Sequence, residues 1–375
     1  MGAPRIYRNP AARPLATTAP ERGPLRFHAT LPAYAPTPLL DAPTAAAALG
    51  VGRLLVKDES ARLGMPSFKI LGASWATFRA LCEHAGADHE QVGGIDGLKA
   101  LLAAGEPVEL VAATDGNHGR AVARMAKLLG LSAHVLVPSD MVPARIAGIE
   151  EEGARVTVVE GSYDEAVAAS AALADATHLV VSDTSWEGYE TIPGWVIDGY
   201  ATIGLEVDEQ LRALGLDAPD LVTAQVGVGA FASAVVRHFR PQGATVVSVE
   251  PTKADCAIAS IEQGQIATVP GPHDSIMAGL NCGSPSLIAW PVLETGVDVF
   301  VAVDDELARE AMRLLARDGI VSGESGAAGL AGLLDRREQL GLDSSMTVLT
   351  ISTEGATDPV GYEAIVGAEP GAVTV

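Results

Sequence analysis

The feature that most restricts the fold of this chain is a regular alternation of short apolar strands and helices that begins near residue 107. Continuous apolar runs predict strands at 108–113, 133–137, 155–159 and 179–182, and helical patterns separate them at 118–129, 143–151 and 163–176. Strands that are apolar along their whole length and alternate with helices are typical of a parallel sheet covered on both faces. The block 107–185 is therefore predicted to form a small α/β domain.

A second series of strands and helices follows the first. Strands are expected at 221–226, 245–249, 297–303 and 345–351, helices at 231–240, from 254 onward and twice across 306–339, and an earlier strand at 54–57. The predicted fold is α/β, with two open lobes, one large and one small, whose twisted sheets are mostly parallel. The large domain is discontinuous (1–106 and 186–375), and its segment 83–106 is a polar, glycine-rich excursion. Ligands of such sheets bind at the carboxyl ends of the strands, so we expect the active site in the cleft between the lobes.

Composition and charge disfavour several classes of function. The 375 residues carry 25 Lys and Arg against 47 Asp and Glu, and a net charge of −22 disfavours binding to nucleic acid or to an anionic membrane. No apolar run is long enough to span a bilayer, and the basic, proline-rich N-terminus lacks the apolar core of a signal peptide. The cysteines, Cys82, Cys256 and Cys282, form neither a disulfide framework nor a zinc-binding spacing. We therefore expect a cytoplasmic protein without a metal site.

Lys69 is the first candidate for chemistry. It lies between Phe68 and Ile70 at the start of an alanine-rich helix, where its neighbours have the character of core residues. A buried lysine amine has a lowered pKa and becomes a nucleophile that forms a Schiff base with a carbonyl group. The alternative is an ordinary lysine whose amine reaches solvent.

Two loops at the ends of predicted strands place carboxylates where a ligand binds. The first, 114–120, contains Asp115, Asn117 and two glycines that let the backbone approach a ligand closely. The second contains Asp183, which directly follows the strand at 179–182. In the alternative interpretation, Asp115 or Asn117 caps the next helix and Asp183 is a turn residue.

A glycine-rich loop, Gly227-Val228-Gly229-Ala230-Phe231, joins a predicted strand to a helix. Its free amides and the helix dipole suit an anion, most naturally a phosphate. The same loop also fits a dinucleotide fingerprint, Gly227-x-Gly229-x-x-Ala232, with Glu250 as the acid about twenty residues later. That alternative leaves Lys69, Asp115 and Asp183 without a role.

Ser352 and Thr353 follow the last predicted strand, where a hydroxyl can meet a heteroaromatic nitrogen. Four features belong together: a lysine amine, a loop with Asn117, a phosphate loop and this hydroxyl. They match an aldehyde, a ring oxygen, a phosphate and a ring nitrogen, which are the groups of pyridoxal 5′-phosphate. The set therefore predicts pyridoxal phosphate as the cofactor.

The chain resembles the fold-type II, or tryptophan synthase β-like, enzymes that use pyridoxal phosphate, and within them the diaminopropionate ammonia-lyases. The motifs that carry the resemblance are KDES (57–60), SFKILGAS (67–74), ATDGNHGRAVA (113–123), DTSWEGYETIP (183–193), GVGAF (227–231), VEPTKADC (249–256), IMAGLNCGSPS (276–286), IVSGESGAAGL (320–330) and ISTEGATD (351–358). Asp115 distinguishes the ammonia-lyase pattern from the serine and threonine dehydratases of this fold, which usually carry serine at that position. Val228, Phe231 and the 83–106 excursion depart from the pattern.

The resemblance implies a carbon–nitrogen lyase that performs α,β-elimination on 2,3-diaminopropionate and releases pyruvate and two ammonia. It implies that Lys69 holds the cofactor and removes the α-proton from one face of the substrate. Asp115 then serves the opposite face, so that both D and L forms react. Asp183 is expected to hold the β-ammonium group.

Further site residues follow from the same resemblance. Phe68, Asn117 and the 227–231 loop are expected to hold the cofactor, Ser352 (with Thr353 second) to meet its ring nitrogen, and Ser67 and Lys253 to bind the substrate carboxylate. Cys256 and Cys282 either form a reversible disulfide or remain free thiols, the commoner state in the cytoplasm. The expected partner is a small amino-acid substrate, and the expected assembly is a homodimer.

Three other functions stay open from the sequence. A serine/threonine dehydratase of the same fold uses the same chemistry, with hydroxide as the leaving group. An NAD-binding Rossmann oxidoreductase would use Gly227, Gly229 and Glu250. A catalytically inactive amino-acid sensor of the same fold is the third, and the intact Lys69 argues against it.

Overall fold

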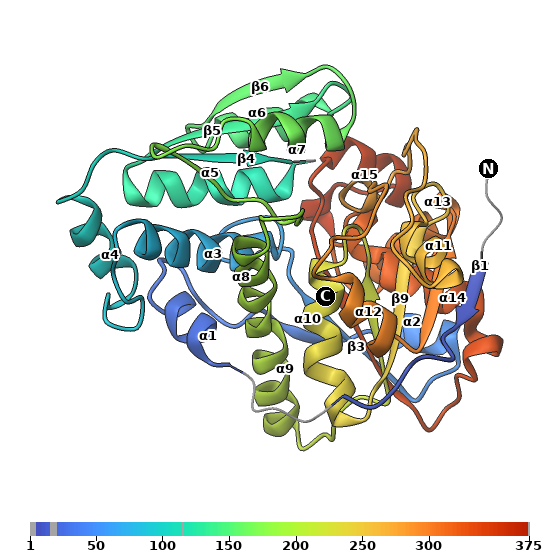
Figure 1. The fold of residues 1–375 in the computed structure, drawn as a ribbon. Coiled ribbons are helices and arrows are strands. Elements are labelled where there is room, and N and C mark those ends of the chain that lie inside the picture. The colour runs from blue at the N-terminus through green and yellow to red at the C-terminus, as the bar shows by residue number, and fades with distance from the viewer. Residues whose placement is uncertain (1–4, 16–20, 115, 374–375) are drawn as a thin grey trace. The chain divides into compact units, whose positions relative to one another are not determined.

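The computed structural model of the protein describes residues 5–15, 21–114 and 116–373. The chain divides into two compact units. The first, which we call the large unit, comprises 1–20, 36–61 and 203–375. The second, the small unit, comprises 21–35 and 62–202. Figure 1 labels many of the helices and strands of both units.

The large unit is built on a seven-stranded sheet in the order β1-β10-β9-β8-β11-β3-β2. Its strands are β1 (Arg5–Arg8), β2 (Leu39–Asp41), β3 (Arg53–Asp58), β8 (Leu221–Gln225), β9 (Thr245–Pro251), β10 (Val299–Val303) and β11 (Thr347–Ser352). The inner strands are parallel, which confirms the predicted sheet, whereas β1 and β2 are antiparallel edge strands. The sequence does not reveal these edge strands, because they are short and lie in a proline-rich region.

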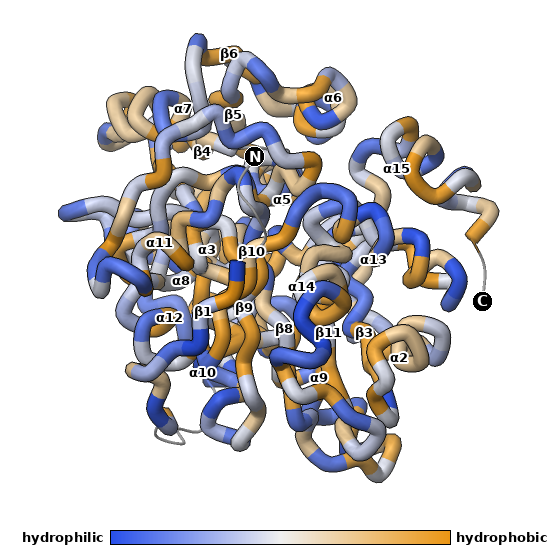
Figure 2. Tube along the Cα trace, turned by 90° about the vertical axis from the view of Figure 1, so that its right-hand side faces the viewer, coloured by the Kyte–Doolittle hydropathy of each residue, from blue (hydrophilic) through white to orange (hydrophobic). Residues whose placement is uncertain are grey.

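The large unit also contains helices, of which α9 overlaps the boundary with the small unit. They are α2 (Pro43–Leu49), α9 (Ala201–Leu214), α10 (Ala230–Phe239), α11 (Cys256–Gln263), α12 (Trp290–Gly296), α13 (Asp305–Arg317), α14 (Glu324–Leu340) and α15 (Pro359–Val366), with 3₁₀ turns at Arg240–Gln242, Ala278–Leu280 and Pro370–Ala372. Helix α14 lies directly on the sheet, since a Cβ at Gly329 would come within 2.4 Å of Thr223 and one at Gly332 within 2.5 Å of Val249. In Figure 2 the neighbouring strands β9 and β10 form a largely hydrophobic centre.

The small unit is built on a four-stranded parallel sheet in the order β6-β5-β4-β7. Its strands are β4 (Glu109–Ala113), β5 (Ser132–Pro138), β6 (Arg155–Val159) and β7 (His178–Val180). Its helices are α1 (Gly23–His28), α3 (Lys69–His84), α4 (Gly94–Leu102), α5 (Asn117–Leu129), α6 (Pro143–Glu150), α7 (Tyr163–Ala171) and α8 (Thr191–Gly199). The predicted alternation across 107–185 and the mostly parallel α/β fold are thereby confirmed.

The small unit takes in more of the chain than the block 107–185. Helix α3 packs against α5 and α8, so the segment that begins with Lys69 lies in this unit. Gly72 permits the close approach, because a Cβ there would lie 2.6 Å from the ring of Tyr200. The predicted domain boundaries stay a prediction, since a compact unit is not necessarily a domain that folds independently.

Several helices differ in extent from the prediction. The helix expected at 163–176 ends at Ala171, because Asp175 accepts the backbone N–H groups of Thr177 and His178 and forms a turn. Between β7 and β8 the chain forms two helices, α8 and α9, which meet at Tyr200. The excursion 83–106 contains α4, which buries two apolar side chains.

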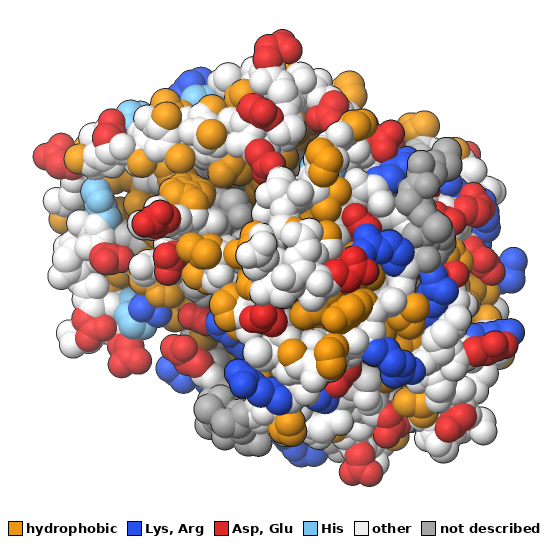
Figure 3. Space-filling view, turned by 45° about the vertical axis from the view of Figure 1, so that its right-hand side comes forward, with side chains coloured by type: hydrophobic (Ala, Val, Ile, Leu, Met, Phe, Trp, Pro, Cys, Tyr) orange, Lys and Arg blue, Asp and Glu red, His pale blue; other side chains and the backbone are white. Residues whose placement is uncertain are grey.

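Two whole-chain properties bear on function. Among the described residues, every helix is too short or too polar to cross a lipid bilayer. On the face drawn in Figure 3, acidic and basic side chains are interspersed, so this face carries no continuous basic patch of the kind that binds nucleic acid.

Candidate active site

Lys69 is the first residue of α3, and its amine lies against a buried carboxylate. Its Nζ donates a hydrogen bond of 2.5 Å to Oδ2 of Asp183. The side chain of Lys69 is 17% exposed and that of Asp183 is 6% exposed. Phe68 and Ile70 on either side are buried. The amine therefore has the inward orientation that its neighbours predict.

Further polar groups lie near the carboxylate of Asp183. Tyr163 donates its hydroxyl proton to Oδ1 at 3.1 Å, and Nδ1 of His118 lies 3.9 Å from Oδ2. Burial by itself would raise the pKa of the Asp183 carboxyl, but the charge of Lys69 and the hydrogen bonds from Lys69 and Tyr163 outweigh it and hold that pKa well below its usual range. Asp183 is therefore an ionised, buried acceptor for cations. The sequence had not assigned a role to Tyr163 or His118, although His118 lies in a family-like motif.

An aromatic hairpin holds the loop that carries Asp183. The Tyr189 hydroxyl accepts a hydrogen bond of 3.0 Å from the N–H of Ser182 and donates one of 2.7 Å to the carbonyl of Val180. The Tyr189 ring stacks on Trp186, with ring centroids 4.2 Å apart and planes 11° apart. The Trp-Glu-Gly-Tyr stretch therefore fixes the backbone directly before Asp183.

The loop before α5 is closed by Thr114. Its hydroxyl oxygen accepts hydrogen bonds from the N–H groups of Gly116 (2.8 Å) and Gly119 (3.0 Å). Thr114 thus supplies the bonds that the alternative interpretation assigned to Asp115 or Asn117. Asn117 is the first residue of α5 and is partly exposed. Asp115 lies outside the described residues.

In the large unit, the loop between β8 and α10 forms an anion cradle. Gly229 precedes α10 at a φ of +96°, which favours glycine, and no side chain within the described residues caps this ten-residue helix. A Cβ at Gly227 would lie 3.1 Å from the sulfur of Cys282, so a side chain there would require its neighbours to shift. The carbonyl of Val228 accepts a hydrogen bond of 2.8 Å from Ser286 and anchors the loop. Uncapped amides at a helix start suit a phosphate.

Ser352 ends β11, the strand next to β8 in the same sheet. Its buried hydroxyl donates a hydrogen bond of 2.7 Å to the hydroxyl of Ser322. Gln225, the last residue of β8, donates from Nε2 to the carbonyls of Ile351 (2.7 Å) and Gly326 (3.0 Å). A hydroxyl and a phosphate cradle therefore lie at the carboxyl ends of neighbouring strands. The sequence missed Gln225 and Ser322, although Ser322 lies in a family-like motif.

Glu250 has a structural role that removes the dinucleotide alternative. Its carboxylate accepts hydrogen bonds from the N–H groups of Ala257 (2.9 Å) and Ile258 (2.7 Å) in α11. Burial raises the pKa of this carboxyl to about 8, against the opposite effect of the two hydrogen bonds. A carboxylate engaged at a helix start does not bind the hydroxyls of a ribose.

Lys253 is engaged by two carboxylates. Its Nζ lies 3.1 Å from Oδ2 of Asp305 and 3.3 Å from Oδ1 of Asp274. The hydrogen bond to Asp305 is the main cause that raises the pKa of this amine. Ser67 is buried directly before α3. The substrate role of both residues stays a prediction, and the two acidic partners of Lys253 favour a structural role for it.

Cys256 and Cys282 are buried beside the 227–231 loop and are not joined in a disulfide. The sulfur of Cys256 lies 3.8 Å from the carbonyl oxygen of Gly227. Burial raises the pKa of the Cys256 thiol well above its usual value. Of the two states open from the sequence, the structure has the one without the disulfide. In the part of the chain that is described, no three His, Cys, Asp or Glu side chains are grouped to hold a metal ion.

These residues fit pyridoxal phosphate. The small unit offers a largely buried amine for the aldehyde, and the large unit offers a glycine-containing cradle at a helix start and a buried hydroxyl. The cradle is suited to the phosphate and the hydroxyl to the ring nitrogen.

Known proteins are similar to this chain over most of its length. The family model for pyridoxal-phosphate dependent enzymes matches residues 30–354. A diaminopropionate ammonia-lyase of Escherichia coli (strain K12) is 38% identical over 360 residues, which cover 91% of this chain and 89% of that protein. The crystal structure of the selenomethionine-incorporated holo enzyme from Escherichia coli has a TM-score of 0.90 at 35% identity and covers 97% of both chains. The structure of that enzyme in complex with D-serine has a TM-score of 0.89 at 36% identity, again over 97% of both chains.

Both the family match and the similarity to the ammonia-lyase extend over most of the chain, and the solved structures confirm the fold-type II architecture. The cofactor predicted from the lysine, the glycine loop and the terminal hydroxyl is the one that this family uses. The chain therefore belongs to the family of pyridoxal-phosphate dependent enzymes, as a relative of the diaminopropionate ammonia-lyases.

Proposed function

We propose that this enzyme is an ammonia-lyase that performs α,β-elimination on D- and L-2,3-diaminopropionate and releases pyruvate and two ammonia. The observation that carries the proposal is the buried ion pair between Lys69 and Asp183. A carboxylate that binds one ammonium in a site with little water can bind another, and this substrate carries an ammonium on its β-carbon. The similarity to the Escherichia coli enzyme supports the same substrate.

The chain's own residues suit each part of the cofactor. Pyridoxal phosphate, when bound, supplies an electron sink that makes the α-proton of an amino acid acidic. Lys69 and the adjacent Phe68 would hold the aldehyde end, Asn117 the ring oxygen, the amides of 227–231 the phosphate, and Ser352 the ring nitrogen. A neutral hydroxyl at that nitrogen favours elimination over transamination.

Lys69 and Asp115 are proposed as bases on opposite faces of the substrate. The Lys69 amine takes the α-proton of the L form, and the carboxylate of Asp115 takes that of the D form. The aspartate at 115, where related dehydratases carry serine, supports this assignment. We expect Asp115→Asn to lower kcat for D-diaminopropionate by about 100-fold or more, since a general base contributes about 10²–10⁴ to a rate. Turnover of the L form should fall far less, and an equal loss for both forms would contradict the two-base assignment.

Asp183 is proposed to hold the β-ammonium as it leaves. Asp183→Asn keeps the size of the side chain and removes its charge. We expect kcat/KM for diaminopropionate to fall about 10- to 100-fold more than kcat/KM for serine, because a hydrogen bond to a charged group is stronger than one to a neutral group. A coupled assay of pyruvate measures both. A wild-type enzyme that forms pyruvate from serine and none from diaminopropionate would instead be a serine/threonine dehydratase.

We infer that the enzyme is a cytoplasmic homodimer. Cysteines that are not joined in a disulfide support a reducing compartment, and the resemblance to the ammonia-lyases supports the dimer. Light scattering of the purified protein is expected to give twice the chain mass of 38.5 kDa. A mass equal to one chain would contradict the dimer.

A further inference from the structure

His118 is a buried histidine to which the proposed reaction gives no role. Its Nε2 lies 2.8 Å from the carbonyl oxygen of Val181, so this nitrogen carries a proton and donates it. In a neutral imidazole the other nitrogen, Nδ1, is then an acceptor. Nδ1 has no hydrogen-bond partner among the described residues, and the side chain is 1% exposed.

Nδ1 belongs to a cluster of acceptors around Asp183. It lies 3.9 Å from Oδ2 of Asp183, and the Tyr163 hydroxyl, whose proton goes to Oδ1, keeps only acceptor capacity on its oxygen. Acceptors that face one another without a donor between them are unfavourable in a buried site. The cluster is therefore complementary to a group with several N–H bonds. In the structure the ammonium of Lys69 is such a group, 2.5 Å from Oδ2.

We propose that His118, together with Asp183 and Tyr163, forms the binding site for the β-ammonium of the substrate, and that Nδ1 of His118 makes this site selective for an amine over a hydroxyl. The inference rests on the proposed function and adds a specificity-determining residue to it. An ammonium offers three N–H donors to the three side chains, whereas the hydroxyl of serine offers one. A site built from acceptors rejects the ligand that leaves them unpaired.

Two substitutions test the roles of the two nitrogens of His118 separately. His118→Gln keeps an N–H near the position of Nε2 for Val181 and removes the Nδ1 acceptor. His118→Asn places an amide oxygen near the position of Nδ1 and gives up the bond to Val181. We expect His118→Gln to lower the ratio of kcat/KM for diaminopropionate to that for serine by about 10- to 100-fold, the effect of a hydrogen bond to a charged group. His118→Asn should keep a ratio closer to that of the wild type. A ratio that falls equally in both variants, or only in the Asn variant, would overturn the proposal.

A second measurement needs neither cofactor nor turnover. Lys69→Ala removes the resident ammonium and leaves the carboxylate of Asp183 beside His118 and Tyr163. We expect methylammonium chloride to raise the Tm of this variant, prepared without cofactor, more than tetramethylammonium chloride does at the same concentration. Tetramethylammonium has the same charge and no N–H donor, and His118→Gln in the same background should reduce the difference.

Equal Tm values in the two salts would overturn the ammonium site. Selective stabilisation by methylammonium in a protein whose wild type is inactive on diaminopropionate would keep the site and reject the proposed substrate.

Discussion

Asp183 acquires its proposed role from its surroundings rather than from its own chemistry. Burial alone would favour the neutral acid, but the ammonium of Lys69 and the hydroxyl of Tyr163 keep it ionised. The bonds of the Tyr189 hydroxyl to the backbone directly before Asp183 hold that carboxylate in place. A single buried hydroxyl is therefore expected to control how well the carboxylate meets a cation.

The prediction concerns Tyr189→Phe, which removes that hydroxyl and keeps the ring on Trp186. We expect the free energy of unfolding to fall by about 1–3 kcal/mol, because a buried carbonyl and a buried N–H lose their partner. The ratio of kcat/KM for diaminopropionate to that for serine should fall as well, since Asp183 loses its support. Urea unfolding and the pyruvate assay measure the two effects. Tyr7→Phe in β1 is the matched control, and a Tyr189 variant that behaves like it would contradict the positioning role.

Among the strands, β8 and β11 matter most for the proposed site, because their order in the sheet places the residues proposed to bind the cofactor. From β8 the chain continues to β9 and β10 on one side, while β11 and β3 lie on the other, so β8 and β11 flank the switch point of the sheet. These strands pair at Leu221–Val348 and Val222–Leu349. Beyond those pairs, side chains bridge them: Thr223 bonds Thr350 at 2.8 Å, and Gln225 bonds the carbonyl of Ile351. Gln225 therefore couples the phosphate loop to Ser352.

The prediction for this bridge uses Gln225→Met, which keeps the length of the side chain and removes its amide. We expect the affinity of the apoenzyme for pyridoxal phosphate to fall about tenfold or more, because the phosphate loop and Ser352 lose their common support and two buried carbonyls lose their donor. Fluorescence titration measures the affinity. Thr350→Val, deeper in the same bridge, is the control, and it should lower Tm with little effect on affinity. Equal affinities in the wild type and the Gln225 variant would contradict the coupling.

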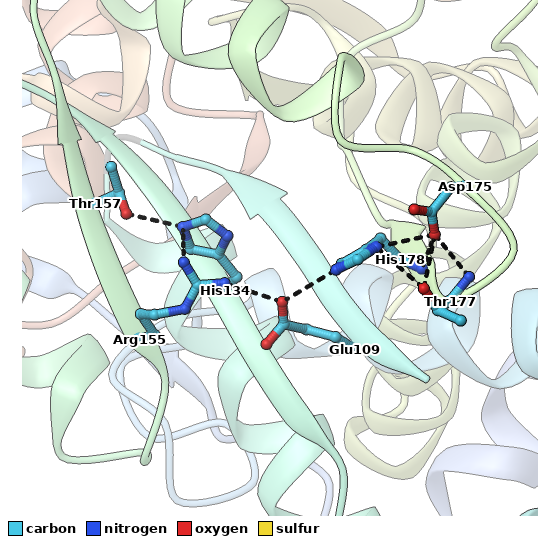
Figure 4. Close-up of polar contacts among 7 residues, drawn as sticks. All are labelled: Glu109, His134, Arg155, Thr157, Asp175, Thr177 and His178. Atoms are coloured by element: carbon cyan, nitrogen blue, oxygen red, sulfur yellow. Dashed lines mark hydrogen bonds and ion pairs between the residues drawn. The ribbon is translucent and has the colours of Figure 1, made fainter. Parts of the chain in front are cut away.

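The dependence of stability on pH is a property of the whole molecule that one cluster helps to set. In the small unit, polar side chains link all four strands of the sheet (Figure 4). Nε2 of His134 accepts a hydrogen bond from Arg155 (3.1 Å) and lies 2.8 Å from the hydroxyl oxygen of Thr157, and Arg155 also donates to Glu109 (3.1 Å). Burial, and then the charge of Arg155, lowers the pKa of His134. Glu109 opposes this shift, and His178, beside Glu109, adds to it. The native state therefore favours the neutral ring.

The sign of the effect follows from linkage. A histidine whose pKa is lower in the folded state contributes stability above its unfolded value of about 6.5 and loses it as the pH falls through the folded value. We expect the free energy of unfolding to decrease between pH 7.5 and pH 5, and to decrease less steeply in His134→Gln. Urea unfolding at several pH values measures the slopes. His84→Gln, an exposed histidine at the end of α3, is the control, and equal slopes in the wild type and the His134 variant would contradict the assignment.

Local patterns in the sequence were enough to predict the inner strands and most of the helices. Continuous apolar runs gave β4, β8 and β10 nearly to the residue, because a strand buried on both faces admits few polar residues. The edge strands β1 and β2 escaped prediction, because a strand of three or four residues leaves no periodic pattern. Glu250 was ambiguous for a different reason: an acid after a strand looks the same whether it binds a ribose or caps α11.

The sequence alone was sufficient for the α/β class and the cofactor, and it proposed Lys69 and the glycine-rich loop as parts of the site. Each of these depends on residue type and short-range spacing, and those are written directly in the chain. Which side chains meet was decided by packing. Lys69 and Asp183 are 114 residues apart, and only the docking of α3 beside α5 in the small unit brings the amine to the carboxylate, with His118 and Tyr163 beside it. Such distances depend on how elements pack in three dimensions, and no local pattern encodes them.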